Sequence, residues 1–500
     1  MARAMERMEI GTDIVTAFSR AARAYSGRAA IIEDGRTLSY AQLQARAQEF
    51  ARRIAARSQG RFVGIVMDHG ADMIAAILGA LMAGKGYVPI EPDFPPERIG
   101  YILGQAEADL VVTQCRYRGL FDGGPHTLFA GDMQAQAGAL PQQIDPEAPA
   151  YVLYTSGTTG FPKGVMVAHR NLCHYVRAFQ NEFHPGLGDV MLQNSVCTFD
   201  IFVEEVFPIL LSGGALAIAD VGARGDFDKL LAFIKRYDVT MVSGFPYLMI
   251  RFNHLDKLPG KLRLLISGGD VLRYEYVKNL LGRVAVYNTY GPSETTVCAT
   301  YFRCGPASAL ADGTFPVGRA VTGARVRVLD ESLRPVPQGQ VGEICIYGGG
   351  VSLGYLKNSA ENAAHFARDP ETGERLYRSG DLGRVLPDGE LAFLERKDQQ
   401  VMILGKRVEP MEVENVLNRC PGIEQAVVES ALDEQGLSYL TAYLLIEGAL
   451  RLKEVRAYLG RYLPAYMVPE FFVKMESFPK TSGGKVDRRA LPVVLKEGTV

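Results

Sequence analysis

The chain has 500 residues, of which 47% are hydrophobic, and its formal net charge is −2. Such a chain buries large cores, while the lack of a lysine run, a basic stripe or an acidic tail argues against a nucleic-acid-binding or disordered protein. Seven cysteines without paired spacing, an N-terminus without an apolar signal segment and apolar runs too short to span a membrane favour a cytoplasmic protein with small partners.

The first two-thirds of the chain alternates short apolar segments, rich in β-branched residues, with helical stretches such as 41–56. The expected strands in this part are 62–67, 110–112, 239–242 and 264–266. This alternation predicts a large core of layered α/β subdomains with largely parallel sheets. From about Ala324 the pattern changes to strand-rich segments, which predict a small β subdomain at 325–329 and 343–347.

The short charged segment 394–400 has no apolar periodicity and separates this core from a second region of mixed pattern. Beyond it we expect a helix and three strands, at 409–418 and at 401–403, 425–428 and 439–444. These segments predict a small, compact C-terminal α+β region, whereas 394–400 is on composition alone a plain surface turn.

The loop Tyr154-Thr-Ser-Gly-Thr-Thr-Gly-Phe-Pro-Lys-Gly164 combines three glycines with short hydroxyl side chains and one lysine. Glycine lets backbone N–H groups approach phosphate oxygens closely, the hydroxyls add donors, and Lys163 adds positive charge. The loop lacks the Gly-Lys-Ser/Thr ending of a P-loop, because Pro162 precedes the lysine. A Gly/Thr-rich loop is by itself most often a plain surface connection, but this combination favours a polyphosphate site.

This string resembles the signature loop of the adenylate-forming superfamily, which includes acyl-CoA synthetases, luciferases and the adenylation domains of nonribosomal peptide synthetases. Further segments resemble motifs of the same family and follow in its order, at 38–43, 84–90, 288–296, 342–348, 377–383, 396–398 and 479–485. The resemblance runs from about Leu38 to Leu491. It implies two domains, an N-terminal core, 1–397, and a small, mobile C-terminal α+β lid, 398–500. It implies ATP-dependent activation of a carboxylic acid to an acyl-adenylate, with ATP and Mg²⁺ required.

The resemblance also implies roles for individual residues. Lys485 would bridge the α-phosphate and the attacking carboxylate, Glu294 would help to bind Mg²⁺, Tyr290 would stack on adenine, and Asp398 would be the hinge of the lid. Asp381 would hold the ribose hydroxyls with support from Arg396, since a carboxylate accepts from both hydroxyls of a diol. The expected ATP-binding residues are Thr155, Ser156, Gly157, Thr158, Thr159, Gly160, Lys163, Asn288, Tyr290, Gly291, Asp381 and Arg396, and the catalytic ones are Lys485, Thr155 and Glu294. For Lys485, Tyr290, Asp381 and Arg396 the plain alternatives are a solvated lysine, a core tyrosine and surface ion pairs.

Two carboxylates, Asp200 and Glu204, stand four residues apart in an otherwise apolar segment, so both lie on one face of a helix. In amino-acid-activating relatives the position that matches Asp200 holds the substrate α-ammonium, which implies an amino acid substrate. Glu204 falls on a side-chain pocket position, although a solvated or internally paired carboxylate remains an alternative. A second carboxylate calls for a second ammonium, because a neutral substrate would leave it unpaired at a cost of roughly 2–5 kcal/mol.

The full expected pocket resembles those of lysine-activating relatives and comprises Asp200, Ile201, Glu204, Ser243, Ile266, Gly268, Thr289, Val297, Cys298 and Lys485. It favours lysine, with ornithine, β-lysine or diaminobutyrate as variants. With no carrier domain after 491, we expect a free-standing enzyme that passes the activated acid to the phosphopantetheine thiol of a separate carrier protein. An acyl- or aryl-CoA ligase and a non-catalytic protein of the same fold are the alternatives.

Overall fold

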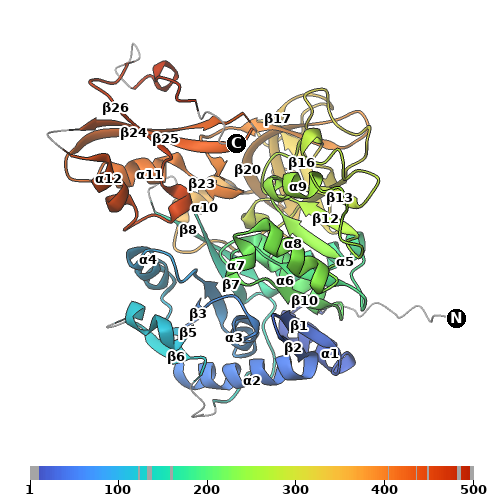
Figure 1. The fold of residues 1–500 in the computed structure, drawn as a ribbon. Coiled ribbons are helices and arrows are strands. Elements are labelled where there is room, and N and C mark those ends of the chain that lie inside the picture. The colour runs from blue at the N-terminus through green and yellow to red at the C-terminus, as the bar shows by residue number, and fades with distance from the viewer. Residues whose placement is uncertain are drawn as a thin grey trace. The chain divides into compact units, whose positions relative to one another are not determined.

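The computed structural model describes residues 11–121, 124–131, 138–157, 161–403, 405–434, 436–446, 450–480 and 486–495. The chain divides into two compact units (Figure 1). The first consists of Met1–Pro92, Leu103–Leu153 and Gly164–Lys397, and the second of Asp93–Ile102, Tyr154–Lys163 and Asp398–Val500. The second unit thus takes up two short segments of the first half of the chain.

Two large sheets form the framework of the first unit. The nine-stranded sheet has the order β15 (Arg319–Ala320), β14 (Thr300–Arg303), β13 (Ala285–Tyr290), β12 (Leu264–Ser267), β11 (Met241–Gly244), β9 (Val190–Gln193), β10 (Ala215–Ile218), β1 (Ala29–Glu33) and β2 (Arg36–Ser39). The strands from β13 to β1 in this order pair in parallel, whereas β14, β15 and β2 are antiparallel additions at the two edges. Parallel strands of this kind are usually buried on both faces.

The other large sheet has seven strands. Their order is β18 (Gly354–Tyr355), β8 (Lys163–Ala168), β7 (Pro149–Thr155), β4 (Gly86–Pro89), β3 (Phe62–Val66), β5 (Leu110–Thr113) and β6 (His126–Phe129). β3 pairs in parallel with both β4 and β5, so the carboxyl ends of these strands meet at one edge.

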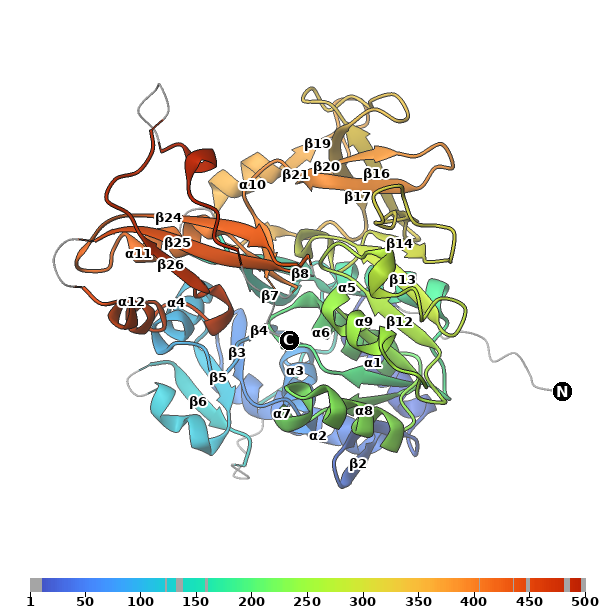
Figure 2. The same ribbon diagram turned by 45° about the horizontal axis from the view of Figure 1, so that its top comes forward.

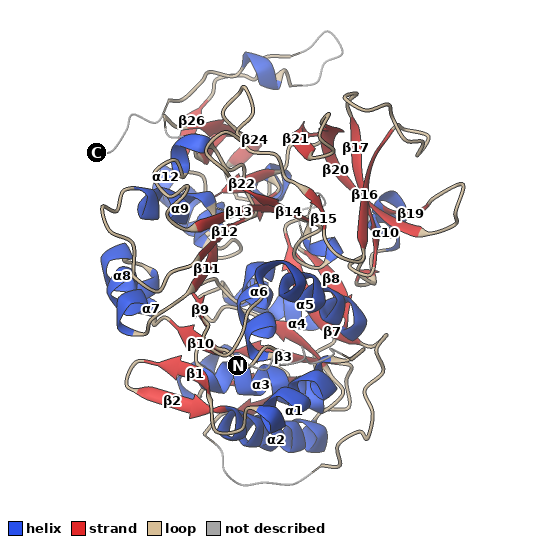
Figure 3. Cartoon of the chain, turned by 90° about the vertical axis from the view of Figure 1, so that its right-hand side faces the viewer, coloured by secondary structure: helices blue, strands red, loops and turns tan. Residues whose placement is uncertain are grey.

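Helices cover these sheets, in places on both faces. They are α1 (Ile14–Ala24), α2 (Tyr40–Arg57), α3 (Ala71–Met82), α5 (His169–Phe183), α6 (Asp200–Leu210), α7 (Val221–Arg224), α8 (Phe227–Arg236), α9 (Pro246–Asn253) and α10 (Ser359–His365). A further helix, α4 (Pro96–Ala106), begins in the segment 93–102 of the second unit. Alternate strand residues enter different cores: Leu264 and Ile266 pack into the core that contains α3, α5 and α6, and Leu265 into the core under α8 and α9. Figure 3 shows α5 and α6 side by side.

A smaller antiparallel sheet completes the first unit (Figure 2). It is formed by β16 (Ala324–Leu329), β17 (Gly342–Gly348), β20 (Arg375–Val385), β19 (Phe366–Arg368) and β21 (Leu391–Arg396). The predicted β subdomain corresponds to this sheet.

The C-terminal part of the second unit is a small α+β arrangement. Its elements are β22 (Val401–Ile403), β23 (Lys406–Val408), α11 (Pro410–Leu417), β24 (Ile423–Leu432), β25 (Ser438–Ile446), α12 (Leu452–Leu459) and β26 (Phe471–Lys474). Val413, Leu417 and Val455 from the two helices pack against Val428, Ala442 and other strand residues in one core.

The predicted fold class, an α/β core with a small β subdomain and a small α+β C-terminal part, is confirmed. The domain limits 1–397 and 398–500 stay a prediction, because compactness alone does not show which parts move together. Among the described residues, no helix combines the length and the apolar character that a membrane crossing requires.

Candidate active site

Asp200 is the first residue of α6 and follows Phe199, whose extended backbone precedes the helix. The Ser293 hydroxyl donates to Oδ2 of Asp200 over 2.6 Å. Burial raises the pKa of Asp200 to about 6 against the effect of the Ser293 hydrogen bond, and the neighbouring charge of Glu294 raises it further. A carboxylate at the start of a buried helix, with only a hydroxyl as its side-chain donor among the described residues, is suited to receive a cation.

Glu204 lies one turn further along α6 and is 2% exposed. The Ser243 hydroxyl donates to Oε1 over 2.5 Å, the Tyr175 hydroxyl donates to Oε2, and the Cys298 thiol lies 3.9 Å from Oε2. Burial raises the pKa of Glu204 to about 7, although the donors from Ser243 and Tyr175 lower it, and the charge of Asp200 adds to the rise. All three hydrogen-bonding partners are neutral, and no basic side chain pairs with Glu204 within the described ranges.

The remaining pocket positions lie on neighbouring strands and the loop after β13. Ser243 and Ile266 are register partners in β11 and β12, and both are buried. A Cβ on Gly268 would lie 2.7 Å from the Thr289 hydroxyl, so glycine at this position lets Thr289 pack closely against the backbone. Val297 and Cys298 follow β13, and Val297 has a φ of 71°, an uncommon conformation for a β-branched residue. Ile201 is buried at the start of α6.

A second set of predicted residues meets where β13 approaches the small sheet. The Tyr290 hydroxyl donates to Oδ2 of Asp381, and the Arg396 guanidinium donates to Oδ1, both over 2.5 Å. Asp381 and Arg396 are register partners in β20 and β21. Asn288, on β13, donates its side-chain amide to the Pro316 carbonyl over 2.9 Å, and Gly291 has no room for a side chain, since a Cβ would lie 2.6 Å from Ala299 N.

Glu294 is fully buried, and its Oε1 accepts a hydrogen bond from the Tyr355 hydroxyl over 2.6 Å. Glu294 therefore lies in the interior of the first unit, and the Tyr355 hydrogen bond fixes the position of its Oε1. It directly follows Ser293, which contacts Asp200. Asp200, the predicted substrate residue, is thus hydrogen-bonded to the neighbour in sequence of Glu294, the predicted metal residue.

The signature loop belongs to the second compact unit. The Ser156 hydroxyl donates to the Arg407 carbonyl over 2.9 Å and accepts from the Glu409 amide over 3.1 Å, while the Gly157 amide donates to Glu412 over 3.2 Å. Oγ1 of Thr155 is buried without a hydrogen-bond partner within the described part of the chain. The Gly157 amide therefore faces a carboxylate oxygen.

Lys163 is 4% exposed at the start of β8, and Asp398 accepts from the Gln400 amide over 3.2 Å. Lys485, Thr158, Thr159 and Gly160 lie outside the described residues.

Three contacts were not predicted from the sequence, although they engage predicted residues: Tyr175 with Glu204, Ser293 with Asp200 and Tyr355 with Glu294. Ser293 lies within a recognised motif. Tyr175 stands on the buried face of the amphipathic helix α5, and this periodicity signals burial but no partner.

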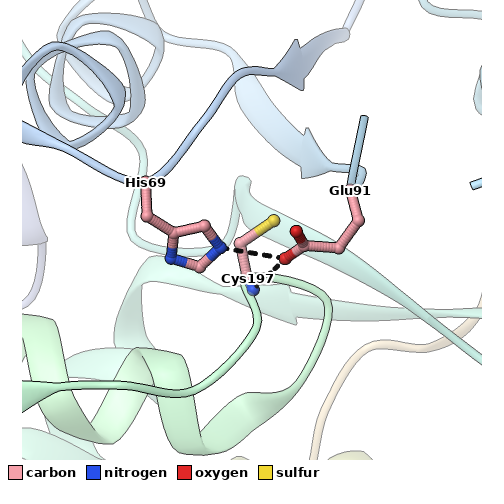
Figure 4. Close-up of side chains that lie close together, drawn as sticks. All are labelled: His69, Glu91 and Cys197. Carbon is pink, nitrogen blue, oxygen red and sulfur yellow. Dashed lines mark hydrogen bonds and ion pairs between the residues drawn. The ribbon is translucent and has the colours of Figure 1, made fainter. Parts of the chain in front are cut away.

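One group of side chains in the described ranges has ligand atoms close enough together for a metal ion: His69, Glu91 and Cys197, whose ligand atoms lie within 4.8 Å of one another. Figure 4 shows the His69 ring and the Glu91 carboxylate facing each other beside Cys197. These residues were not predicted as a site.

The model of the family described as AMP-binding enzyme matches residues 18–356, and that of the AMP-binding enzyme C-terminal domain matches 412–485. The chain therefore belongs to the AMP-binding enzyme family, and it is an adenylation domain of the nonribosomal peptide synthetase type. It is 38% identical over 469 residues to bacitracin synthase 2 of Bacillus licheniformis, a match that covers 93% of this chain and 18% of that protein.

Two solved structures show the same relationship. Holo-PA1221, a nonribosomal peptide synthetase protein with adenylation and PCP domains bound to a vinylsulfonamide inhibitor, has 26% identity and a TM-score of 0.85, with 96% of this chain and 83% of that chain covered. Holo-AB3403, a four-domain nonribosomal peptide synthetase bound to AMP and glycine, has 30% identity and a TM-score of 0.70, with 98% and 37% covered. The chain thus spans less than a fifth of bacitracin synthase 2 and a larger part of these structures.

Proposed function

We propose that the protein activates an amino acid with two amino groups, with L-lysine the favoured substrate, to its aminoacyl-adenylate and releases pyrophosphate. The observation that carries this proposal is the buried carboxylate of Glu204, one helical turn from Asp200, with only neutral hydrogen-bond donors among the described residues. A carboxylate without a cationic partner is costly to bury, and a distal ammonium would supply the missing charge. Asp200 then binds the α-ammonium.

ATP would bind with Tyr290 against adenine and Asp381, supported by Arg396, on the ribose hydroxyls. The pair Asp381 and Arg396 supports this role, because it holds a carboxylate in a fixed orientation beside Tyr290. The amino acid carboxylate attacks the α-phosphorus, and Lys485 would neutralise charge between the two groups. Thr155, Ser156 and Gly157 would contribute hydroxyl and amide donors to the phosphates.

Glu294 is the residue that would hold Mg²⁺. Its carboxylate fits this ion, which takes oxygen ligands from one or two carboxylates together with substrate phosphates. The Tyr355 hydroxyl donates to Oε1 and so orients the carboxylate. Bound Mg²⁺ supplies charge neutralisation for the departing pyrophosphate.

The acceptor of the activated acid is, in this proposal, the phosphopantetheine thiol of a carrier protein. The similarity to adenylation–PCP structures supports a carrier as partner. That the carrier is a separate chain, that the enzyme is cytoplasmic and that Asp398 is the hinge stay predictions.

The direct test is substrate-dependent exchange of pyrophosphate into ATP with lysine, ornithine, β-lysine, diaminobutyrate and all other proteinogenic amino acids. Glu204→Gln is compared with the wild type, and Glu424→Gln, at an exposed position of β24, is the matched control. We expect strong exchange with one diamino acid, a loss of at least about a hundredfold in kcat/KM in Glu204→Gln, and no change in the control. Norleucine, which lacks the distal ammonium of lysine, should be a poor substrate of the wild type.

Preferred exchange with a neutral or acidic amino acid would overturn the diamino assignment and leave amino acid adenylation in place. Exchange with no acid, at any Mg²⁺ concentration, would overturn the enzymatic proposal. Loading of a carrier protein, measured as a mass shift, tests the acceptor separately.

A further inference from the structure

The cluster of His69, Glu91 and Cys197 lies where the carboxyl ends of several strands converge. His69 follows β3, Glu91 follows β4, and Cys197 lies in the segment 194–199, which joins the end of β9 to Asp200 at the start of α6. The His69 side chain is 2% exposed. The cluster is therefore a buried feature adjacent in sequence to the predicted amino acid anchor.

The His69 ring contacts an acceptor with each of its nitrogens. Nε2 lies 3.0 Å from Oε1 of Glu91, and Nδ1 lies 3.0 Å from Oε1 of Gln193. The orientation of the Gln193 amide is fixed by its nitrogen, which donates to the Ser195 carbonyl over 2.6 Å and to Glu205 over 3.0 Å. Both ring nitrogens thus contact side-chain oxygens, so the ring links Glu91 to Gln193.

The partners of His69 bind the backbone of the segment before Asp200. Glu91 accepts from the Cys197 amide over 2.7 Å, and Gln193 donates to the Ser195 carbonyl. Glu205 accepts from the Asn194 amide over 3.2 Å and from the Ser195 hydroxyl over 2.8 Å. Backbone groups of residues 194–197 are therefore hydrogen-bonded by three side chains, those of Glu91, Gln193 and Glu205. His69 contacts the first two of these.

The ring also packs edge-to-face on Phe202 of α6, with centroids 5.8 Å apart. Arg224 of α7 adds a positive charge that acts on Glu91, Glu205 and Cys197. Although burial raises the pKa of Glu91, its bonds to His69 and Cys197 outweigh burial and lower it to about 2, so the Glu91 carboxylate is ionised.

We propose that His69 is a positioning residue for substrate binding: its ring joins Glu91 and Gln193 into one network that holds residues 194–199 and so fixes Asp200. The expected effect of His69 on amino acid binding rests on the proposed function. Its expected effect on the stability of residues 194–199 does not. A bound metal ion is the competing reading of the cluster. The network is favoured, because the His69 nitrogens, Oε1 of Glu91 and the Gln193 amide already have protein partners.

The test uses His69→Phe, which keeps a ring against Phe202 and removes both hydrogen bonds, and Glu91→Gln, which keeps the size of the side chain and removes its charge. His126→Phe, at an exposed position of β6, is the matched control. In pyrophosphate exchange, we expect His69→Phe to raise the KM for the amino acid about tenfold and the KM for ATP less than about twofold. Glu91→Gln should raise the amino acid KM by a smaller factor, and the control should change neither KM.

Hydrogen–deuterium exchange of the peptide that contains 194–199 gives a readout without activity. We expect faster exchange there in His69→Phe than in the wild type and the control, with unchanged exchange in the small sheet formed by β16, β17, β19, β20 and β21. If His69→Phe does not fold, Glu91→Gln carries both measurements.

Unchanged exchange of this peptide together with an unchanged amino acid KM would overturn the proposal. A stoichiometric metal ion in the purified wild type, lost in His69→Phe, would overturn it in favour of a metal site. A wild type that exchanges pyrophosphate with no acid would contradict the proposed function, while hydrogen exchange would still decide whether His69 holds the segment.

Discussion

Glu204 links the proposed substrate pocket to the pH dependence of stability. Its pKa is raised to about 7 by burial, whereas an exposed glutamate titrates near 4.5. Between these values the folded protein holds a proton that the unfolded chain has released, so the contribution of Glu204 to stability is present at low pH and is lost as the pH rises through 7. Substrate-free wild type should therefore lose stability from pH 5 to pH 8 through this group.

We predict that the fall in the free energy of unfolding between pH 5 and pH 8 is smaller in Glu204→Gln than in wild type, by about 2–4 kcal/mol. Urea denaturation without substrate measures this difference. Asp200 is present in both proteins, so its titration enters the difference only through its electrostatic coupling to Glu204. Equal falls in the two proteins would mean that Glu204 is ionised in the empty pocket.

At this scale the sequence predicted that Asp200 and Glu204 share one helix but not how their carboxylates are held. The four-residue spacing of Asp200 and Glu204 places both on one helical face. The partner Tyr175 lies 29 residues before Glu204, and its contact depends on the packing of α5 against α6. Periodicity reports only that Tyr175 is buried, because a local pattern carries no information on a partner in another element.

At the scale of elements, Tyr40 connects α2 with the end of α6. The side chain is fully buried, and its hydroxyl lies 3.0 Å from the Leu210 carbonyl and 2.7 Å from the Gly214 carbonyl. Leu210 is the last residue of the helix that carries Asp200 and Glu204. The single hydroxyl proton is thus shared between the last carbonyl of α6 and a carbonyl of the turn that follows, where the helix leaves backbone oxygens without intrahelical donors.

We predict that Tyr40→Phe lowers the free energy of unfolding by about 1–3 kcal/mol, because buried carbonyls lose their donor while no carbon atom is removed. Tyr87→Phe is the matched control: Tyr87 is also fully buried, but its hydroxyl has no hydrogen-bond partner within the described residues. Calorimetry should show a lower Tm for Tyr40→Phe and an unchanged or higher Tm for Tyr87→Phe. Equal effects of the two changes would argue that the Tyr40 hydrogen bonds contribute nothing net.

At the scale of the whole molecule, the alternation of strands and helices was sufficient to predict the fold class. It did not predict that 93–102 and 154–163 form one compact unit with the C-terminal part. Segments 93–102 and 398–500 are joined by contacts such as that of Arg98 with Glu412, 314 residues apart in sequence. This pairing could not be predicted from the sequence, because the residues around Arg98 and Glu412 do not distinguish them from charged residues at the surface.

Arg98 and Glu412 test this arrangement directly. Their side chains are 5% and 1% exposed and form an ion pair of 2.8 Å, and Glu412 also accepts from the Gly157 amide. A single change that removes one partner leaves the other charge buried, which costs about 3–5 kcal/mol, whereas replacing both by apolar side chains costs much less.

In a double-mutant cycle, Arg98→Met and Glu412→Leu should each destabilise the second compact unit. The loss of stability in the double variant should be smaller than the sum of the two single losses by about 2 kcal/mol or more. Urea unfolding followed by hydrogen exchange of peptides from β24 and β25 assigns the loss to this unit. The pair Arg461→Met and Glu97→Leu, whose charged atoms are 3.7 Å apart at exposed positions, is the control cycle and should be additive within about 0.5 kcal/mol. Additive losses at Arg98 and Glu412 would contradict the assignment of 93–102 to the unit that contains α11. Two residues that are not in contact in the folded protein have no interaction free energy, so their losses add.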